Sequence, residues 1–160
     1  MQQEKNNTAK KNKHLAVLFW VLSCVCFVLI FYFSSRTRSE SSLQSAFFVA
    51  LLRKVFGTNF FTDFIVRKGA HLLEYAGTAL MLSAAYYFSL NKNKLYLPLI
   101  TASLYAVTDE IHQIIVPGRA CQLRDWVIDT AGAILGIAIY YLIYSVIKRI
   151  KLKHPGEDKI

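Results

Sequence analysis

The stretch LYLPLITASLYAVTDEIHQIIVPGR, residues 95–119, changes character abruptly at its middle. Its first thirteen residues form a lipid-soluble apolar run, and two adjacent acids and a histidine follow directly. The closing Val116-Pro117-Gly118-Arg119 predicts a type II turn, because proline fixes the first central residue and glycine supplies the positive φ of the second. We therefore expect a helix that ends in polar groups before the chain turns back.

The rest of the chain has the composition of a membrane protein. Of its 160 residues, 54% are hydrophobic and 14% are aromatic. Four stretches, 15–33, 70–90, 95–115 and 126–147, approach the roughly 20 apolar helical residues that cross a hydrocarbon core. We predict an all-α, polytopic membrane helix bundle with four transmembrane helices over residues 15–147, flanked by basic cytoplasmic tails at 1–14 and 148–160. The first run lacks a following small-residue cleavage site, which favours a retained anchor over a signal peptide.

The net charge of +9 is concentrated beside the membrane spans. The flanking basic residues are Lys10, Lys11 and Lys13 before the first span, and Lys148, Arg149, Lys151 and Lys153 after the last. The positive-inside rule then predicts a multi-pass protein with both termini in the cytoplasm. This placement argues for membrane lipids as partners and against nucleic acid.

The segment between the first two spans contains a further amphipathic helix. LQSAFFVALLRKVFG, residues 43–57, places Phe47, Leu51 and Val55 on one stripe, with Arg53 and Lys54 outside it. The helix is too short to span, so we expect it to lie in the membrane interface. A re-entrant hairpin with the following FFTDFIV is the alternative.

Ionisable and amide side chains gather at the ends of the spans. They are His71 and Glu74 in the second span, Asp109, Glu110, His112 and Gln113 in the third, and Arg124, Asp125 and Asp129 around the start of the fourth. Because successive spans alternate in direction, all of them are expected at one membrane face, the extracytoplasmic one. Spacings of three or four residues put His71 with Glu74, and Asp125 with Asp129, on shared helical faces.

This polar cluster has two explanations. An ionisable group at the centre of a span costs about 2.5–3.5 kcal/mol, and less near the interface, so the cluster should be paired and face inward. It could merely hold helices together, but its size favours a functional role. Arg119 and Arg124 could bind a phosphate or carboxylate, or instead anchor at headgroups or pair with Asp125. Gly132 and Gly136 predict close helix packing.

Cysteine chemistry contributes little to the prediction. Cys24 and Cys26 lie two residues apart within the first span, on different helical faces, and Cys121 stands alone in a loop. This pattern fits neither a disulfide framework nor a CxxC metal site. Cys121 could be a reactive thiol.

The combination of FYFSS (31–35), KGAHLLEYAGTAL (68–80) and TDEIHQIIVPGRACQLRDWVIDTAGAILG (108–136) resembles the VanZ-like family of small bacterial membrane proteins. The resemblance covers residues 31–136 and implies four or five membrane helices in the bacterial cell membrane. It also implies a role linked to low-level resistance to teicoplanin, a glycopeptide that binds cell-wall precursors. The positions that match the family pattern are His71, Glu74, Tyr75, Asp109, Glu110, His112, Gln113, Pro117, Gly118, Arg119, Asp125, Asp129 and Gly132.

Two classes of function remain open. One is a non-enzymatic envelope factor that binds the glycopeptide or a lipid-linked cell-wall precursor; its candidate binding residues are His71, Tyr75, Gln113, Arg119, Arg124, Asp125 and Asp129. The other is an intramembrane enzyme, a hydrolase or transferase that acts on a lipid-linked or envelope substrate. Its candidate catalytic residues are Glu74, Asp109, Glu110 and His112. A divalent metal could assist it, with candidate ligands His71, Glu74, Glu110 and His112.

Two weaker alternatives complete the predictions. Ser34 or Ser35 could approach His71 as a nucleophile. A transporter would need an inverted repeat or broken central helices, and the sequence shows neither feature.

Overall fold

The fold is all-α, as predicted. The computed structural model describes residues 2–153, and for residues 2–11 and 151 it describes the backbone alone. The described part of the chain forms five helices: α1 (Gln2–Ser34), α2 (Arg38–Phe56), α3 (Asp63–Leu90), α4 (Tyr96–Gln113) and α5 (Leu123–Lys153).

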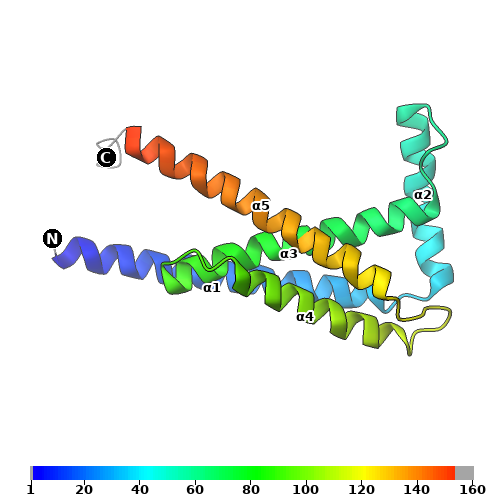
Figure 1. The fold of residues 1–160 in the computed structure, drawn as a ribbon, viewed down its shortest axis with the longest axis horizontal. Coiled ribbons are helices and arrows are strands. Elements are labelled where there is room, and N and C mark those ends of the chain that lie inside the picture. Colours follow the sequence, from blue (N-terminus) through cyan, green and yellow to red (C-terminus); the bar gives the residue numbers. More distant parts are fainter. Residues whose placement is uncertain (1, 154–160) are drawn as a thin grey trace.

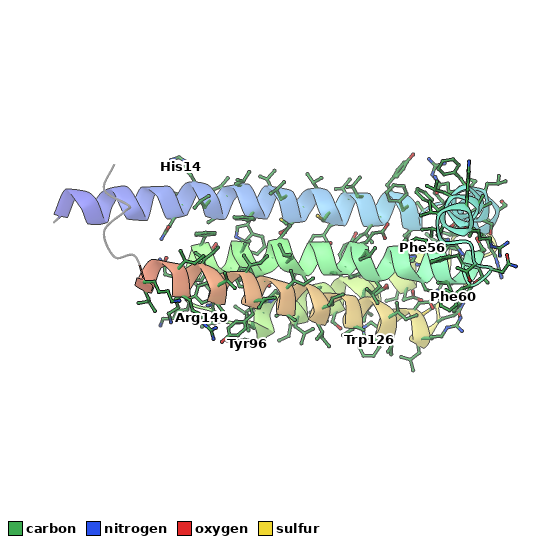
Figure 2. All side chains as sticks on the ribbon, turned by 90° about the horizontal axis from the view of Figure 1, so that it is seen from above. His14, Phe56, Phe60, Tyr96, Trp126 and Arg149 are labelled. Atoms are coloured by element: carbon green, nitrogen blue, oxygen red, sulfur yellow. The ribbon has the colours of Figure 1, made fainter. Side chains whose placement is uncertain are left out.

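Helices α1, α3, α4 and α5 run along one long axis, and α2 lies across one end (Figure 1). The helices α1 and α4 end, and α3 and α5 begin, at the end where α2 crosses the bundle. Phe56 and Phe60 lie at this α2 end, whereas His14 and Arg149 lie toward the opposite end (Figure 2). The predicted meeting of the polar segments at one end of the bundle is therefore confirmed as an arrangement of helices.

The helix boundaries differ from the predicted spans. Helix α1 begins at Gln2, so the basic segment before the first apolar run continues the same helix, and α3 begins seven residues before position 70. Hydropathy marks only the apolar part of a helix, whereas capping groups decide where it begins and ends. Thr62 caps α3 by accepting a hydrogen bond from the Ile65 backbone at 3.3 Å. Helix α5, which contains the fourth predicted span, extends to Lys153, and residues 154–160 of the predicted tail lie outside the described residues.

Helix α2 is a separate element with defined ends. Thr37 and Glu40 form a reciprocal capping box, and Gly57 ends the helix at φ +63°. The pKa of Glu40 is lowered mainly by the hydrogen bond that its carboxylate accepts from the Thr37 backbone. A second hydrogen bond, from the Thr37 hydroxyl, lowers it further. The predicted apolar stripe is exposed, with Phe47 at 68% and Val55 at 66%. Helix α2 therefore crosses the bundle end with its apolar face exposed.

The tightest packing in the fold joins α3 to α5. A Cβ added at Gly132 would lie 2.3 Å from the Leu72 carbonyl oxygen, and one added at Gly136 would lie 2.0 Å from the Ala76 carbonyl oxygen. The two helices therefore run side by side in the same direction, in backbone contact. The close approach predicted from the Gly-x-x-x-Gly spacing is confirmed.

The long sides of the bundle are apolar and exposed. Two segments, Asn12–Ser34 of α1 and Leu123–Ile150 of α5, are long and apolar enough to cross a membrane by length and composition. Only 17% and 22% of their most apolar windows are buried inside the bundle. Burial within the protein therefore does not account for the apolar character of these helices.

Candidate functional site

One histidine and two aspartates from three different helices meet near the α2 end of the bundle. His71 comes from α3, Asp109 from α4 and Asp129 from α5, and one potential ligand atom from each lies within 4.8 Å of the others. The side chain of His71 is 20% exposed, whereas Asp109 and Asp129 are 3% and 1% exposed. We call these three residues the His71 group.

The contacts around the His71 group leave several polar atoms without partners. His71 Nδ1 lies 3.7 Å from Asp129 Oδ1 and 4.0 Å from Glu74 Oε2, both beyond hydrogen-bond distance. Gln113 Nε2 donates to Asp109 Oδ2 at 3.2 Å and lies 3.1 Å from Ser34 Oγ. Among the described residues, Asp109 Oδ1 and both carboxylate oxygens of Asp129 have no hydrogen-bond partner.

The loop between α4 and α5 closes over this region. Gly118 adopts φ +77°, and the Arg119 backbone N–H donates to the Val116 carbonyl at 3.1 Å, which confirms the predicted turn. The Arg119 side chain reaches the end of α1, where Nε donates to the Arg36 carbonyl at 2.8 Å and Nη2 to the Phe33 carbonyl at 3.3 Å. The arginine thus ties the loop to the first helix.

A basic cavity of about 150 Å³ lies beside the His71 group. His71 and Gln113 form part of its wall. Its cationic lining residues are Arg38, Arg67, Lys68, Arg119 and Arg124. Burial lowers the pKa of the Arg119 guanidinium, and the nearby charge of Arg67 lowers it further. A bound anion would relieve this repulsion, so the cavity is suited to a negatively charged group.

A second cavity, of about 280 Å³, adjoins the first. The two cavities share four lining residues: Ser41, Arg67, His71 and Arg119. The second cavity also has apolar walls from α1, α2 and α3, contributed by Phe33, Phe48, Val66 and Ala70. We call it the amphipathic cavity, since Arg67, His71 and Glu74 line its polar side.

The remaining predicted site residues have other partners. Glu110 is 3% exposed, and its Oε2 accepts a hydrogen bond from the Gln122 backbone at 2.7 Å. Tyr75 is fully buried and packs with Ile30 and Ala106, and its hydroxyl has no hydrogen-bond partner among the described residues. His112 Nε2 lies 3.1 Å from Ser35 Oγ, and its ring lies 4.5 Å from that of Phe31.

Two neighbouring charged residues at the start of α5 differ in burial, since Asp125 is mostly buried and Arg124 is exposed. Asp125 pairs with Lys68 through a 2.6 Å contact, with both side chains mostly buried. Arg124 is 58% exposed and lies 3.8 Å from the same carboxylate, so it faces the basic cavity and solvent. The predicted pairing of Arg124 with Asp125 is therefore secondary to that of Lys68.

Two features of the structure bear on the predicted chemistry. Of the four predicted metal ligands, His71 alone belongs to the grouping that the described residues form, and its companions are Asp109 and Asp129. Glu110 points about 100° away from its neighbour Asp109 on α4, and the His112 ring contacts Ser35 and Phe31 at the end of α1. The serines also have other partners than His71, because Ser34 contacts Gln113 and Ser35 contacts His112.

Sequence reasoning missed three cationic residues of the basic cavity: Arg38, Arg67 and Lys68. A signal for two of them was present. Arg67 and Lys68 lie four and three residues before His71, which places them on its helical face. No comparable spacing connects Arg38 to the cavity, because its proximity depends on how α2 crosses the bundle.

The three cysteines are free, and Cys24 and Cys121 are exposed. Neither a disulfide nor a cysteine-containing metal grouping occurs within residues 12–150. Cys121 lies in the α4–α5 loop, and its reactivity as a thiol stays a prediction.

Comparison with known proteins places this arrangement in a family. No curated protein and no solved structure matches the chain significantly. The model of the family described as VanZ/LLP1 matches residues 19–144, which include the His71 group and the whole α4–α5 loop. Because the match covers most of the 160 residues, the chain belongs to the VanZ/LLP1 family.

Proposed function

We propose that this VanZ-family protein binds the anionic headgroup of a lipid-linked envelope precursor at the outer face of the bacterial membrane. The observation that carries the proposal is the junction of the two cavities. One is lined by five cationic side chains, and the other has apolar walls, and they meet at Ser41, Arg67, His71 and Arg119. A ligand with a charged head and an apolar chain would match both.

The chemistry of the basic cavity favours a phosphate or diphosphate. Guanidinium groups form charge-assisted, often bidentate hydrogen bonds with phosphate oxygens. Arg124 and Arg38 stand at exposed positions, whereas Arg67 and Arg119 are partly buried at the junction. The apolar chain of such a ligand would lie along Phe33 and Phe48, beside the exposed apolar face of α2.

The proposal includes a membrane arrangement. All four long helices cross the membrane, α2 lies in the outer interface, and both termini lie in the cytoplasm. The exposed apolar sides of α1 and α5 support this arrangement. In α3 and α4 the charged residues are confined to the α2 end, and residues 75–90 and 95–107 are free of acidic and basic side chains. The charged ends would then lie at the membrane surface, where their insertion cost is lowest.

Binding of the phosphate headgroup is expected to depend on Arg67. Purified protein in neutral phosphatidylcholine nanodiscs should bind undecaprenyl phosphate and not undecaprenol, as measured by native mass spectrometry. Arg67→Gln should weaken binding on the order of tenfold, since one charge-assisted hydrogen bond is lost. Arg149→Gln, at the opposite end of the bundle, should leave it unchanged. Equal binding of phosphate and alcohol, or equal weakening by both substitutions, would contradict the proposal.

Protection against teicoplanin should follow from this binding, because the antibiotic acts on the same class of precursor. Expression in a susceptible Gram-positive host is expected to raise the inhibitory concentration of teicoplanin severalfold, and that of vancomycin less. Arg67→Gln should abolish the rise at equal membrane abundance on an immunoblot, whereas Arg149→Gln should retain it. An unchanged inhibitory concentration with abundant wild-type protein would separate the chain from resistance.

An intramembrane enzyme acting on the same headgroup is the second candidate function. The observation that favours it is the position of His71, which borders both cavities and lies within 4.8 Å of two buried acids. An imidazole beside a carboxylate is a common general acid or base. Release of inorganic phosphate in the nanodisc experiment, lost in His71→Gln, would identify the protein as an enzyme rather than a binding factor.

A further inference from the structure

We infer that His71, Asp109 and Asp129 form a binding site for a first-row divalent cation, Zn²⁺ or Mn²⁺. The inference goes beyond the proposed function and does not depend on lipid binding. It rests on the geometry of three side chains that come from three helices and meet at the α2 end of the bundle.

The first step is the match between the group and a coordination sphere. Metal–ligand bonds of about 2.1 Å place neighbouring ligand atoms roughly 3 Å apart and opposite ones roughly 4.2 Å apart. The ligand atoms of the His71 group lie within 4.8 Å of one another, and His71 Nδ1 lies 3.7 Å from Asp129 Oδ1. Small side-chain rotations would therefore bring all three onto one ion.

The second step is that neither aspartate has a lysine or arginine partner among the described residues. Asp129 is 1% exposed, and neither of its carboxylate oxygens has a hydrogen-bond partner among the described residues. The buried Asp109 Oδ1 also lacks a hydrogen-bond partner there. Both acids face the imidazole of His71. Buried charges are normally paired or bound to a metal, so the orphaned oxygens indicate a missing cationic ligand.

The third step concerns the cations nearby, which are engaged elsewhere. Lys68 pairs with Asp125 at 2.6 Å, and Arg67 pairs with Asp63 at 3.2 Å. Arg119 donates to two backbone carbonyls of the α1 end. The basic residues that surround the group thus do not neutralise its two acids directly.

The fourth step is the identity of the ion. One imidazole nitrogen with two carboxylates is a borderline donor set, which suits Zn²⁺ or Mn²⁺ better than an all-oxygen site suited to Ca²⁺. Sulfur does not contribute, because no cysteine belongs to the grouping within the described residues. Gln113, which donates to Asp109 Oδ2, would orient that carboxylate from outside the coordination sphere.

The position of the ion would connect it to the cavities. His71 lines both cavities, and Gln113 lines the basic one, so the group lies directly behind their shared wall. A cation held there would add positive charge next to the place proposed for an anionic headgroup. It would also join α3, α4 and α5 through one centre.

Metal titration of the full chain tests the inference without any lipid. Detergent-purified protein is stripped with a chelator, dialysed and titrated with ZnCl₂ or MnCl₂, and the bound metal is measured by inductively coupled plasma mass spectrometry. We expect one equivalent of at least one of the two metals and a higher unfolding temperature of the loaded protein. Asp129→Asn and Asp109→Asn should each weaken binding by more than about 100-fold, because even the loss of an outer partner costs 10–100-fold.

Glu110→Gln is the matched control. Glu110 is as buried as Asp109 and adjacent in sequence, but it lies outside the group, so this variant should bind metal as the wild type does. Failure of the stripped wild type to take up either metal would overturn the inference and leave protons to neutralise the acids. Equal loss of binding in Glu110→Gln and Asp129→Asn would overturn it as well. If an aspartate variant does not fold, the wild-type titration alone decides.

Discussion

Replacing Gly136 with alanine is expected to destabilise the bundle strongly, because the added methyl group would collide with the backbone of α3. The new Cβ would lie 2.0 Å from the carbonyl oxygen of Ala76 and 2.9 Å from its Cα. These are backbone atoms of a packed helix, so the contact is relieved only by moving α3 away from α5. Overpacking of this kind costs about 1–3 kcal/mol and occasionally more, and we expect the upper end of that range. Thermal unfolding in detergent, followed by circular dichroism, measures the loss.

Gly77→Ala provides the matched control in the neighbouring helix. A Cβ at Gly77 would meet nothing within 4 Å. Alanine is the better helix former by about 1 kcal/mol, so this variant should melt at or above the wild-type temperature. Gly132→Ala should behave like Gly136→Ala, because its Cβ would lie 2.3 Å from the Leu72 carbonyl oxygen. A Gly136→Ala protein as stable as Gly77→Ala would show that the two helices are not in backbone contact.

Lys68→Met should produce the second large effect. Lys68 Nζ lies 2.6 Å from Asp125 Oδ2, and the two side chains are 19% and 13% exposed. Methionine would leave the carboxylate mostly buried, with the exposed Arg124 at 3.8 Å as its nearest remaining cation. We expect a loss of about 3 kcal/mol in the free energy of unfolding, the lower end for buried pairs because water retains some access. Denaturant or thermal unfolding of the variant measures it.

The double variant Lys68→Met/Asp125→Asn separates the pair from the individual residues. Removing both charges leaves no uncompensated carboxylate, so the double variant should recover much of the stability lost in Lys68→Met. Additive losses would mean that the two side chains stabilise the bundle independently, despite their short contact.

The sequence predicted the gathering of polar groups but not their partners. Alternating spans bring their ends to one face whatever the rotation of each helix, so the meeting of α1, α3, α4 and α5 ends followed from order alone. The rotation of each helix decides which side chains touch. Asp109 and Glu110 are neighbours in sequence, yet one joins His71 and the other accepts from the Gln122 backbone.

The cavities depended on still longer-range information. The apolar stripe predicted the helical character of α2, and the structure adds a start at residue 38 that is capped by Thr37. Its crossing of the bundle end is decided by tertiary contacts, such as that of the Ser45 hydroxyl with the Asp63 carboxylate. The spacing of residues along the chain does not reveal such tertiary contacts. The positions of Arg38 and Ser41 in the cavity walls could therefore not be predicted from the sequence.

The same-direction pairing of α3 with α5 affects how the protein folds during its synthesis on the ribosome. His71 and Asp129 are separated by 58 positions in the chain, and a ribosome adds about 5–20 residues per second. At that rate, roughly 3–12 s pass between the synthesis of α3 and the synthesis of the α5 face that packs against it, which contains Gly132 and Gly136. During this interval its histidine and glutamate stand without their aspartate partner, and translation of the last helix completes the site.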